Sequence, residues 1–99
     1  MKLIEQNKQE LNQLCVNHHV QQLYLFGSIL TDQFNDESDI DMLIQFSTIK
    51  LEDYFDNYMD FKEKLELLFE RSVDLVENQA IKNPVFRKVV DQEKQMIYG

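Results

Sequence analysis

Five residues of the types that handle phosphates and divalent metals fall into three short motifs. Gly27-Ser28 follows an apolar stretch, Asp39 and Asp41 stand two residues apart before another, and Asp74 lies within a third. Side chains of a strand alternate between faces, so Asp39 and Asp41 are expected to project from the same side. Two close carboxylates repel each other unless a cation lies between them, and Mg²⁺ commonly binds one or two carboxylates together with substrate phosphates. The Asp-x-Asp pair is therefore a candidate magnesium site.

Gly27 and Ser28 are interpreted as a phosphate cradle. Glycine permits close backbone approach, the start of a helix presents free N–H groups to an anion, and Ser28 adds a hydroxyl. If the cradle and the carboxylates share one phosphate chain, the end of the first strand lies beside the start of the second, which makes these two strands antiparallel. A lone Asp74 among apolar strand residues is costly to bury unless it is paired or metal-bound. A third strand parallel to the second would bring Asp74 to the other two carboxylates.

Other interpretations of the same residues remain open. The aspartate pair could be solvated turn residues that cap a strand. Asp74 could form a structural salt bridge with Arg71 or Lys50, and Ser28 could be a simple helix cap. A cap at Ser28 would not exclude phosphate binding.

The hydropathy pattern predicts seven elements in the order α-β-α-β-α-β-α. Helices are expected at residues 2–18, 28–34, 51–70 and 84–94, and strands at 20–26, 40–46 and 72–76. The long helix between the second and third strands suits a parallel crossover, and Asn83-Pro84 is typical of an N-cap followed by Pro at the first helical position. The apolar tail 96–98 is expected to dock on the body. The prediction is one α/β (α+β) domain over residues 1–99, with a small mixed three-stranded sheet flanked by helices.

Three groups of side chains outside the motifs are also interpreted from their spacing. His18 and His19 are expected to be surface or helix-end residues that point apart and share no metal. One stripe is expected to be core, with a partner-binding surface as the alternative, namely Tyr54, Phe55, Tyr58 and Phe61. Four cations are expected on solvated faces, with contact of one of them to the nucleotide as the alternative, namely Lys62, Lys64, Arg87 and Lys88.

Composition excludes several classes of function. With 10 Lys and Arg against 18 Asp and Glu, the net charge is −8, so few cations remain for neutralising nucleic-acid phosphates, and direct nucleic-acid binding is not expected. A basic protein partner is compatible with this charge. No stretch approaches the roughly 20 apolar residues of a membrane helix, the N-terminus turns polar too soon for a signal peptide, and Cys15 is the only cysteine. We expect a cytoplasmic protein with no membrane association, no internal disulfide and no cysteine-based zinc site.

Gly-Ser, a spacer, Ser-Asp-x-Asp and a later strand aspartate together resemble the DNA polymerase beta superfamily of nucleotidyltransferases. The resemblance covers essentially the whole chain, and the length is similar to that of minimal nucleotidyltransferases of prokaryotes, which are often antitoxins paired with HEPN-domain ribonuclease toxins. It implies phosphate binding at Gly27 and Ser28 and metal binding at Asp39, Asp41 and Asp74. Asp74 would also activate the acceptor hydroxyl.

The activity that this resemblance implies is transfer of AMP, or another nucleoside monophosphate, from ATP or another nucleoside triphosphate with Mg²⁺. The acceptor would be a hydroxyl on a partner protein such as a HEPN toxin. One departure favours an alternative, because the family commonly places an Arg and a second Gly after Gly-Ser, whereas this chain has Ile29-Leu30-Thr31-Asp32. The alternative is a catalytically weak antitoxin that neutralises its partner by binding alone.

Overall fold

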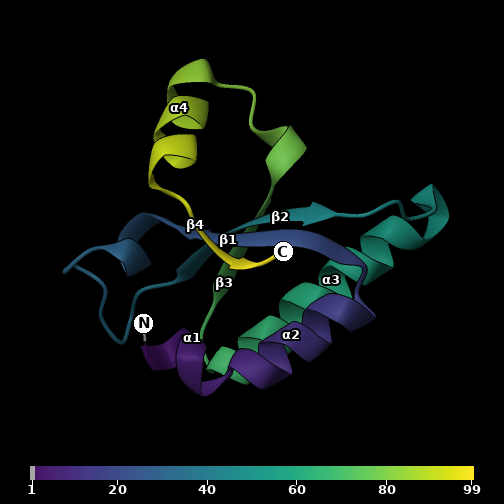
Figure 1. The fold of residues 1–99 in the computed structure, drawn as a ribbon, viewed down its shortest axis with the longest axis horizontal. Coiled ribbons are helices and arrows are strands. Elements are labelled where there is room, and N and C mark those ends of the chain that lie inside the picture. The colour runs from purple at the N-terminus through teal and green to yellow at the C-terminus, as the bar shows by residue number, and fades with distance from the viewer. Residues whose placement is uncertain (1) are drawn as a thin grey trace.

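A mixed four-stranded sheet lies between helices in the computed structural model, which describes residues 2–99 (Figure 1). The helices are α1 (Lys2–Gln6), α2 (Lys8–Asn17), α3 (Leu51–Phe69) and α4 (Pro84–Glu93), with short 3₁₀ helices η1 (Gly27–Leu30) and η2 (Asn78–Ala80). The strands are β1 (Val20–Phe26), β2 (Ile40–Phe46), β3 (Val73–Glu77) and β4 (Gln95–Tyr98). None of the helices within residues 2–99 is long and apolar enough to cross a membrane.

The strands lie in the order β3-β2-β1-β4. β1 is antiparallel to β2 and β2 is parallel to β3, which confirms both predicted relations. The prediction of three strands was wrong, because the tail pairs with the free edge of β1 as an antiparallel fourth strand, with Leu23 opposite Tyr98 and Tyr24 opposite Met96. Backbone N–H and C=O groups at a sheet edge need partners, and β4 supplies them along β1.

The larger hydrophobic core fills the space between one face of the sheet and the helices α1, α2 and α3 (Figure 1). Alternate residues of β2 point into it, namely Ile40, Met42 and Ile44. The helices contribute fully buried side chains, namely Leu11, Cys15, Phe61 and Leu65. Burial raises the pKa of the Cys15 thiol to about 12. Since the thiolate is the reactive form, Cys15 serves as a packing residue.

α4 covers the opposite face of the sheet (Figure 1). Its buried Val90 packs against Phe26 of β1 and Leu43 of β2 in a second, smaller core. The predicted cap is confirmed, because the Asn83 side-chain oxygen accepts hydrogen bonds from the backbone N–H groups of Val85 and Phe86 at 2.9 and 3.1 Å.

Two predicted helices differ from the observed elements. The helix expected at 2–18 is divided at Asn7, whose side-chain Nδ2 donates to the carbonyl of Leu3 at 2.9 Å. The helix expected at 28–34 is reduced to η1, since the Thr31 hydroxyl and backbone N–H both donate to the Ser28 carbonyl, at 2.8 and 2.9 Å, and end the turn. Local side-chain bonds of this kind compete with regular helix.

Burial corrects two of the spacing-based interpretations. Phe55 was expected in the core, but its side chain is 70% exposed, whereas Phe61 is fully buried. His18 lies at a helix end as expected, yet it is buried rather than on the surface. Its Nδ1 faces the Leu14 carbonyl at 2.8 Å and its Nε2 faces the Asp60 carboxylate at 2.7 Å. These two oxygens offset the cost of burying the imidazole.

Candidate functional site

Three side chains form a row across neighbouring strands on the face covered by α4. Phe26 of β1 lies opposite Asp41 of β2, and Asp41 lies beside Asp74 of β3. Residues directly opposite each other in a sheet share a face, so the two carboxylates are cross-strand neighbours. The flanking residues Ile40 and Met42 point to the other face, into the larger core. The fold thus brings together two aspartates that are far apart in the sequence.

Gly27 lies directly against the Asp41 carboxylate. A side-chain Cβ at position 27 would lie 2.3 Å from Asp41 Oδ2, and the backbone of Gly27 has a φ of +77°. Both facts require glycine, because other residues avoid this φ and would collide with the carboxylate. Gly27 opens η1, and Ser28 is the half-buried second residue of that turn. Gly27 is therefore adjacent to the Asp41 carboxylate, a contact that the antiparallel pairing of β1 and β2 makes possible.

Asp39 lies on the exposed approach to β2, two residues before Asp41. Arg71 holds this approach in place, because its Nη1 donates to the carbonyls of Asn35 at 3.0 Å and Ser38 at 2.9 Å. Its guanidinium also lies 4.6 Å from the centre of the Phe34 ring. Arg71 was considered as an ion-pair partner of the β3 aspartate, but it positions the loop before Asp39 instead.

The Asp74 carboxylate makes no salt bridge and no hydrogen bond to any of residues 2–99. The alternative of a structural ion pair with Arg71 or Lys50 is therefore not supported. Burial, followed by the negative charges of Asp74 and Asp39, raises the pKa of Asp41. Both effects disfavour the ionised form, and a cation among the three carboxylates would offset them.

The donor set suits a hard divalent cation such as Mg²⁺, which prefers carboxylate oxygens. Asp41 Oδ2 lies where a Cβ of residue 27 would otherwise be, so the absence of a side chain at Gly27 makes room for this oxygen. Within residues 2–99, no three His, Cys, Asp or Glu side chains are already arranged to hold a metal ion. Mutual repulsion opposes the convergence of three carboxylates, so the fit to Mg²⁺ rests on their chemistry and on the Gly27 contact.

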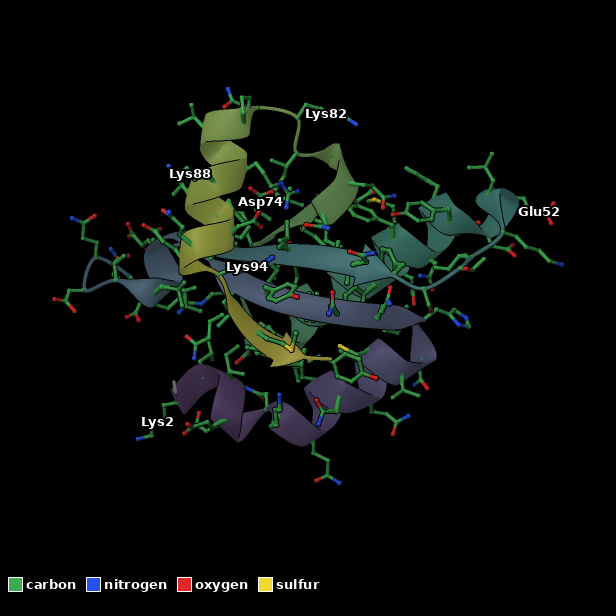
Figure 2. The ribbon with its side chains drawn as sticks, turned by 45° about the horizontal axis from the view of Figure 1, so that its top comes forward. Lys2, Glu52, Asp74, Lys82, Lys88 and Lys94 are labelled. Carbon is green, nitrogen blue, oxygen red and sulfur yellow. The ribbon has the colours of Figure 1, made fainter. Side chains whose placement is uncertain are left out.

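α4 adds residues to this face that sequence reasoning treated as solvated or did not consider. Figure 2 shows Asp74 on the α4 side of the sheet, with Lys88 on the helix and Lys94 at its C-terminal end. Lys94 lies 4.5 Å from the centre of the Tyr24 ring and 3.1 Å from an Asp91 oxygen. The sequence predicted a last helix that begins after Asn83. It did not predict the face of the sheet that this helix covers.

Arg87 anchors α4 to the turn after β3. Its Nη1 donates to Asn78 Oδ1 at 2.9 Å and its Nη2 donates to the Asn78 carbonyl. Arg87 also pairs with Asp91 one turn along the helix, at 3.1 Å. The expectation of a purely solvated Arg87 was therefore wrong, because η2 offers two acceptor oxygens at this position.

A family model described as polymerase beta, nucleotidyltransferase matches residues 9–99. The chain belongs to this nucleotidyltransferase family. A curated relative from Methanocaldococcus jannaschii, named as a candidate protein adenylyltransferase, is 31% identical over 97 residues, which are 94% of this chain and 96% of the relative. The family assignment and this relative agree with the expected enzyme class, a nucleotidyltransferase.

Two solved structures share the fold. A candidate minimal nucleotidyltransferase superposes with a TM-score of 0.78 at 23% identity, covering 95% of this chain and 92% of that one. The second structure contains a tri-AMPylated HEPN toxin of Shewanella oneidensis in complex with an MNT antitoxin. Its TM-score is 0.63 at 21% identity, with coverage of 96% of this chain and 71% of that one. The mixed sheet with helices on both faces is therefore the fold of minimal nucleotidyltransferases.

Proposed function

We propose that this nucleotidyltransferase transfers AMP from Mg²⁺-ATP to a hydroxyl group of a partner protein. The observation that carries the proposal is the contact between Gly27 and the Asp41 carboxylate, with Asp74 beside it in the row. A phosphate turn and paired carboxylates are the parts that phosphoryl-group chemistry requires. The name of the Methanocaldococcus relative supports AMP as the transferred group, and the AMPylated toxin complex supports a HEPN toxin as the acceptor.

Each residue of the site has a role in this proposal. Asp39, Asp41 and Asp74 hold Mg²⁺, which when bound neutralises charge on the triphosphate. The backbone of Gly27 and the hydroxyl of Ser28 bind a phosphate oxygen. The acceptor oxygen forms a bond to the α-phosphorus while the bond from that phosphorus to the pyrophosphate oxygen breaks. Asp74 takes up the proton that the acceptor hydroxyl releases.

The acceptor in this proposal is a hydroxyl on another chain, as the AMPylated toxin in the similar complex suggests. A net charge of −8 favours a partner that presents basic residues around its hydroxyl. The same charge supports the expectation that nucleic acid is not the acceptor.

A second candidate function is neutralisation of the partner by binding alone. The observation that favours it is the segment after Ser28, where Ile29 is buried and Asp32 is exposed, so no cation follows the phosphate turn. A weakened phosphate site would leave the interaction with the partner intact.

One experiment separates the two candidates. The chain is incubated with Mg²⁺, a HEPN-domain toxin and ATP labelled at the α-phosphate, with γ-labelled ATP in parallel. Transfer of AMP places the α-label, and no γ-label, on the toxin. Asp41→Asn should abolish labelling and keep the wild-type melting behaviour, whereas Asp36→Asn, an exposed carboxylate in the loop before β2, should label like wild type. A tight complex without label would support neutralisation by binding and contradict the transfer.

A further inference from the structure

α4 carries an apolar flank that neither core covers. Val85 is 71% exposed, and Phe86 and Val89 are each 43% exposed. Helical spacing places these three side chains along one side of the helix, next to the buried Val90 that attaches α4 to the sheet. Val90 packs against Phe26 and Leu43, so the flank lies at the border of the smaller core.

Phe86 connects this flank to the nucleotide site through a single ring contact. Its ring centre lies 6.1 Å from that of Phe26, with the planes at 70°, an edge-to-face arrangement. Phe26 is the first member of the cross-strand row, opposite Asp41, and it directly precedes Gly27. Phe86 therefore contacts the residue that lies opposite Asp41 and next to Gly27, while 43% of its own surface is exposed.

We propose that Phe86 is the platform on which the base of the bound nucleotide stacks, with Val85 and Val89 as its apolar border. The proposal rests on the proposed function, because the triphosphate bound at the carboxylates is what brings the base to this helix. A base is tethered to its phosphates through one sugar, so an apolar ring beside the phosphate turn is within its reach. Stacking on an aromatic side chain suits any base, since every base has a π-face.

The test compares four variants in the full chain by calorimetric titration with Mg²⁺ present. Phe86→Ala removes the ring, Phe86→Leu keeps apolar bulk without a π-face, and Phe86→Tyr keeps the ring. Phe55→Ala is the matched control, because Phe55 is also an exposed phenylalanine. It lies on α3, which follows the C-terminal end of β2, whereas Asp41 lies at the N-terminal end of that strand. Each protein is titrated with ATP and separately with inorganic tripolyphosphate, which lacks a base, and its melting temperature confirms folding.

Phe86→Ala and Phe86→Leu should bind ATP roughly tenfold more weakly, the loss expected for one stacked base. Their affinity for tripolyphosphate should equal that of wild type, and Phe86→Tyr and Phe55→Ala should resemble wild type with both ligands. Wild-type affinity of Phe86→Ala for ATP would overturn the stacking platform and leave the proposed function standing. Weaker binding of that variant to a HEPN toxin would then identify the flank as a protein contact. Failure of the wild type to bind either ligand would overturn the proposed function together with the platform.

Discussion

At the scale of single residues, the site depends on how closely Gly27 approaches a charged side chain. Asp41 Oδ2 occupies the position that any Cβ at residue 27 would require. The same carboxylate carries the electrostatic strain of the site, because burial and two neighbouring carboxylates raise its pKa. One contact therefore couples the phosphate turn to the metal-binding residues.

Gly27→Ala should lower the free energy of unfolding by about 1–3 kcal/mol and abolish binding of Mg²⁺-ATP, because alanine at a φ of +77° is strained and its Cβ would meet Asp41. Urea unfolding measures the first effect and calorimetry the second. The double variant Gly27→Ala/Asp41→Ala isolates the collision. If its stability equals the sum of the two single effects, the contact with the carboxylate is not the cause.

Asp41→Asn should melt at the wild-type temperature or above at neutral pH, while it loses Mg²⁺-dependent ATP binding. A raised pKa in the folded protein means that the folded state keeps a proton that the unfolded chain has lost, so the stability falls as pH rises through the interval between the two values. Asparagine removes this contribution. Thermal melts from acidic to neutral pH, without metal, measure it. A variant that melts clearly below wild type at neutral pH would identify Asp41 as a structural residue.

At the scale of elements, Arg71 joins two segments that the site needs, the start of β3 and the loop before β2. It stands just after α3 and before β3, and its side chain binds the loop that leads into β2. The position of Asp39 therefore depends on a residue that precedes Asp74 by only three positions. Fixing both segments with one guanidinium reduces the freedom that metal binding would otherwise have to remove.

Arg71→Lys should weaken Mg²⁺-ATP binding by about 1.5 kcal/mol, roughly tenfold, while the protein stays folded. Lysine keeps the charge but lacks the planar guanidinium, which lies over the Phe34 ring while its Nη1 donates to both carbonyls. Calorimetric titration with ATP, with a thermal melt of the same sample, measures the two effects. Unchanged affinity would show that the loop before Asp39 is held by its own turns.

The strands that carry the carboxylates could be predicted from the sequence, and the surroundings of the carboxylates could not. Short apolar runs rich in β-branched and aromatic residues predict β1, β2 and β3. A shared phosphate chain required antiparallel β1 and β2, and the long helix between β2 and β3 suited a parallel crossover; the structure confirms both relations. The four residues of β4 are too few to show a strand pattern in the sequence. They form a strand because the free edge of β1 pairs with them. The burial of His18 depends on Asp60, which lies on α3, far away in the sequence. The contact of Phe86 with Phe26 depends on which face of the sheet α4 covers.

At the scale of the whole molecule, the Asp60 carboxylate, which lies outside the site, connects two helices. Asp60 accepts from the buried His18 ring at 2.7 Å and from Lys64 one helical turn away at 2.7 Å. The hydrogen bond from His18, then that from Lys64, lowers the pKa of Asp60. This group joins the end of α2 to the middle of α3 across the outer layer of the fold.

Asp60→Asn should flatten the loss of stability at acidic pH. A carboxyl whose pKa is lowered in the folded state stabilises the protein above its unfolded pKa, and this contribution disappears as pH falls through the folded value. The wild type should therefore lose more stability than the variant on acidification, the opposite sign to that expected for Asp41. Urea unfolding at a series of pH values tests this, with Asp53→Asn, an exposed carboxylate on the same helix, as the control. Parallel curves for wild type and Asp60→Asn would contradict it.

The pairing of β1 with β4 has a consequence for the order in which the sheet assembles. β1 and β2 are close in the sequence, whereas β1 and β4 come from opposite ends of it, so closing the second pair costs more chain entropy and is expected late in folding. Until β4 docks, the edge of β1 away from β2 presents unpaired backbone N–H and C=O groups. That edge is a template for a strand from a second molecule. Concentrated refolding is where strand exchange between copies of this chain should first be seen.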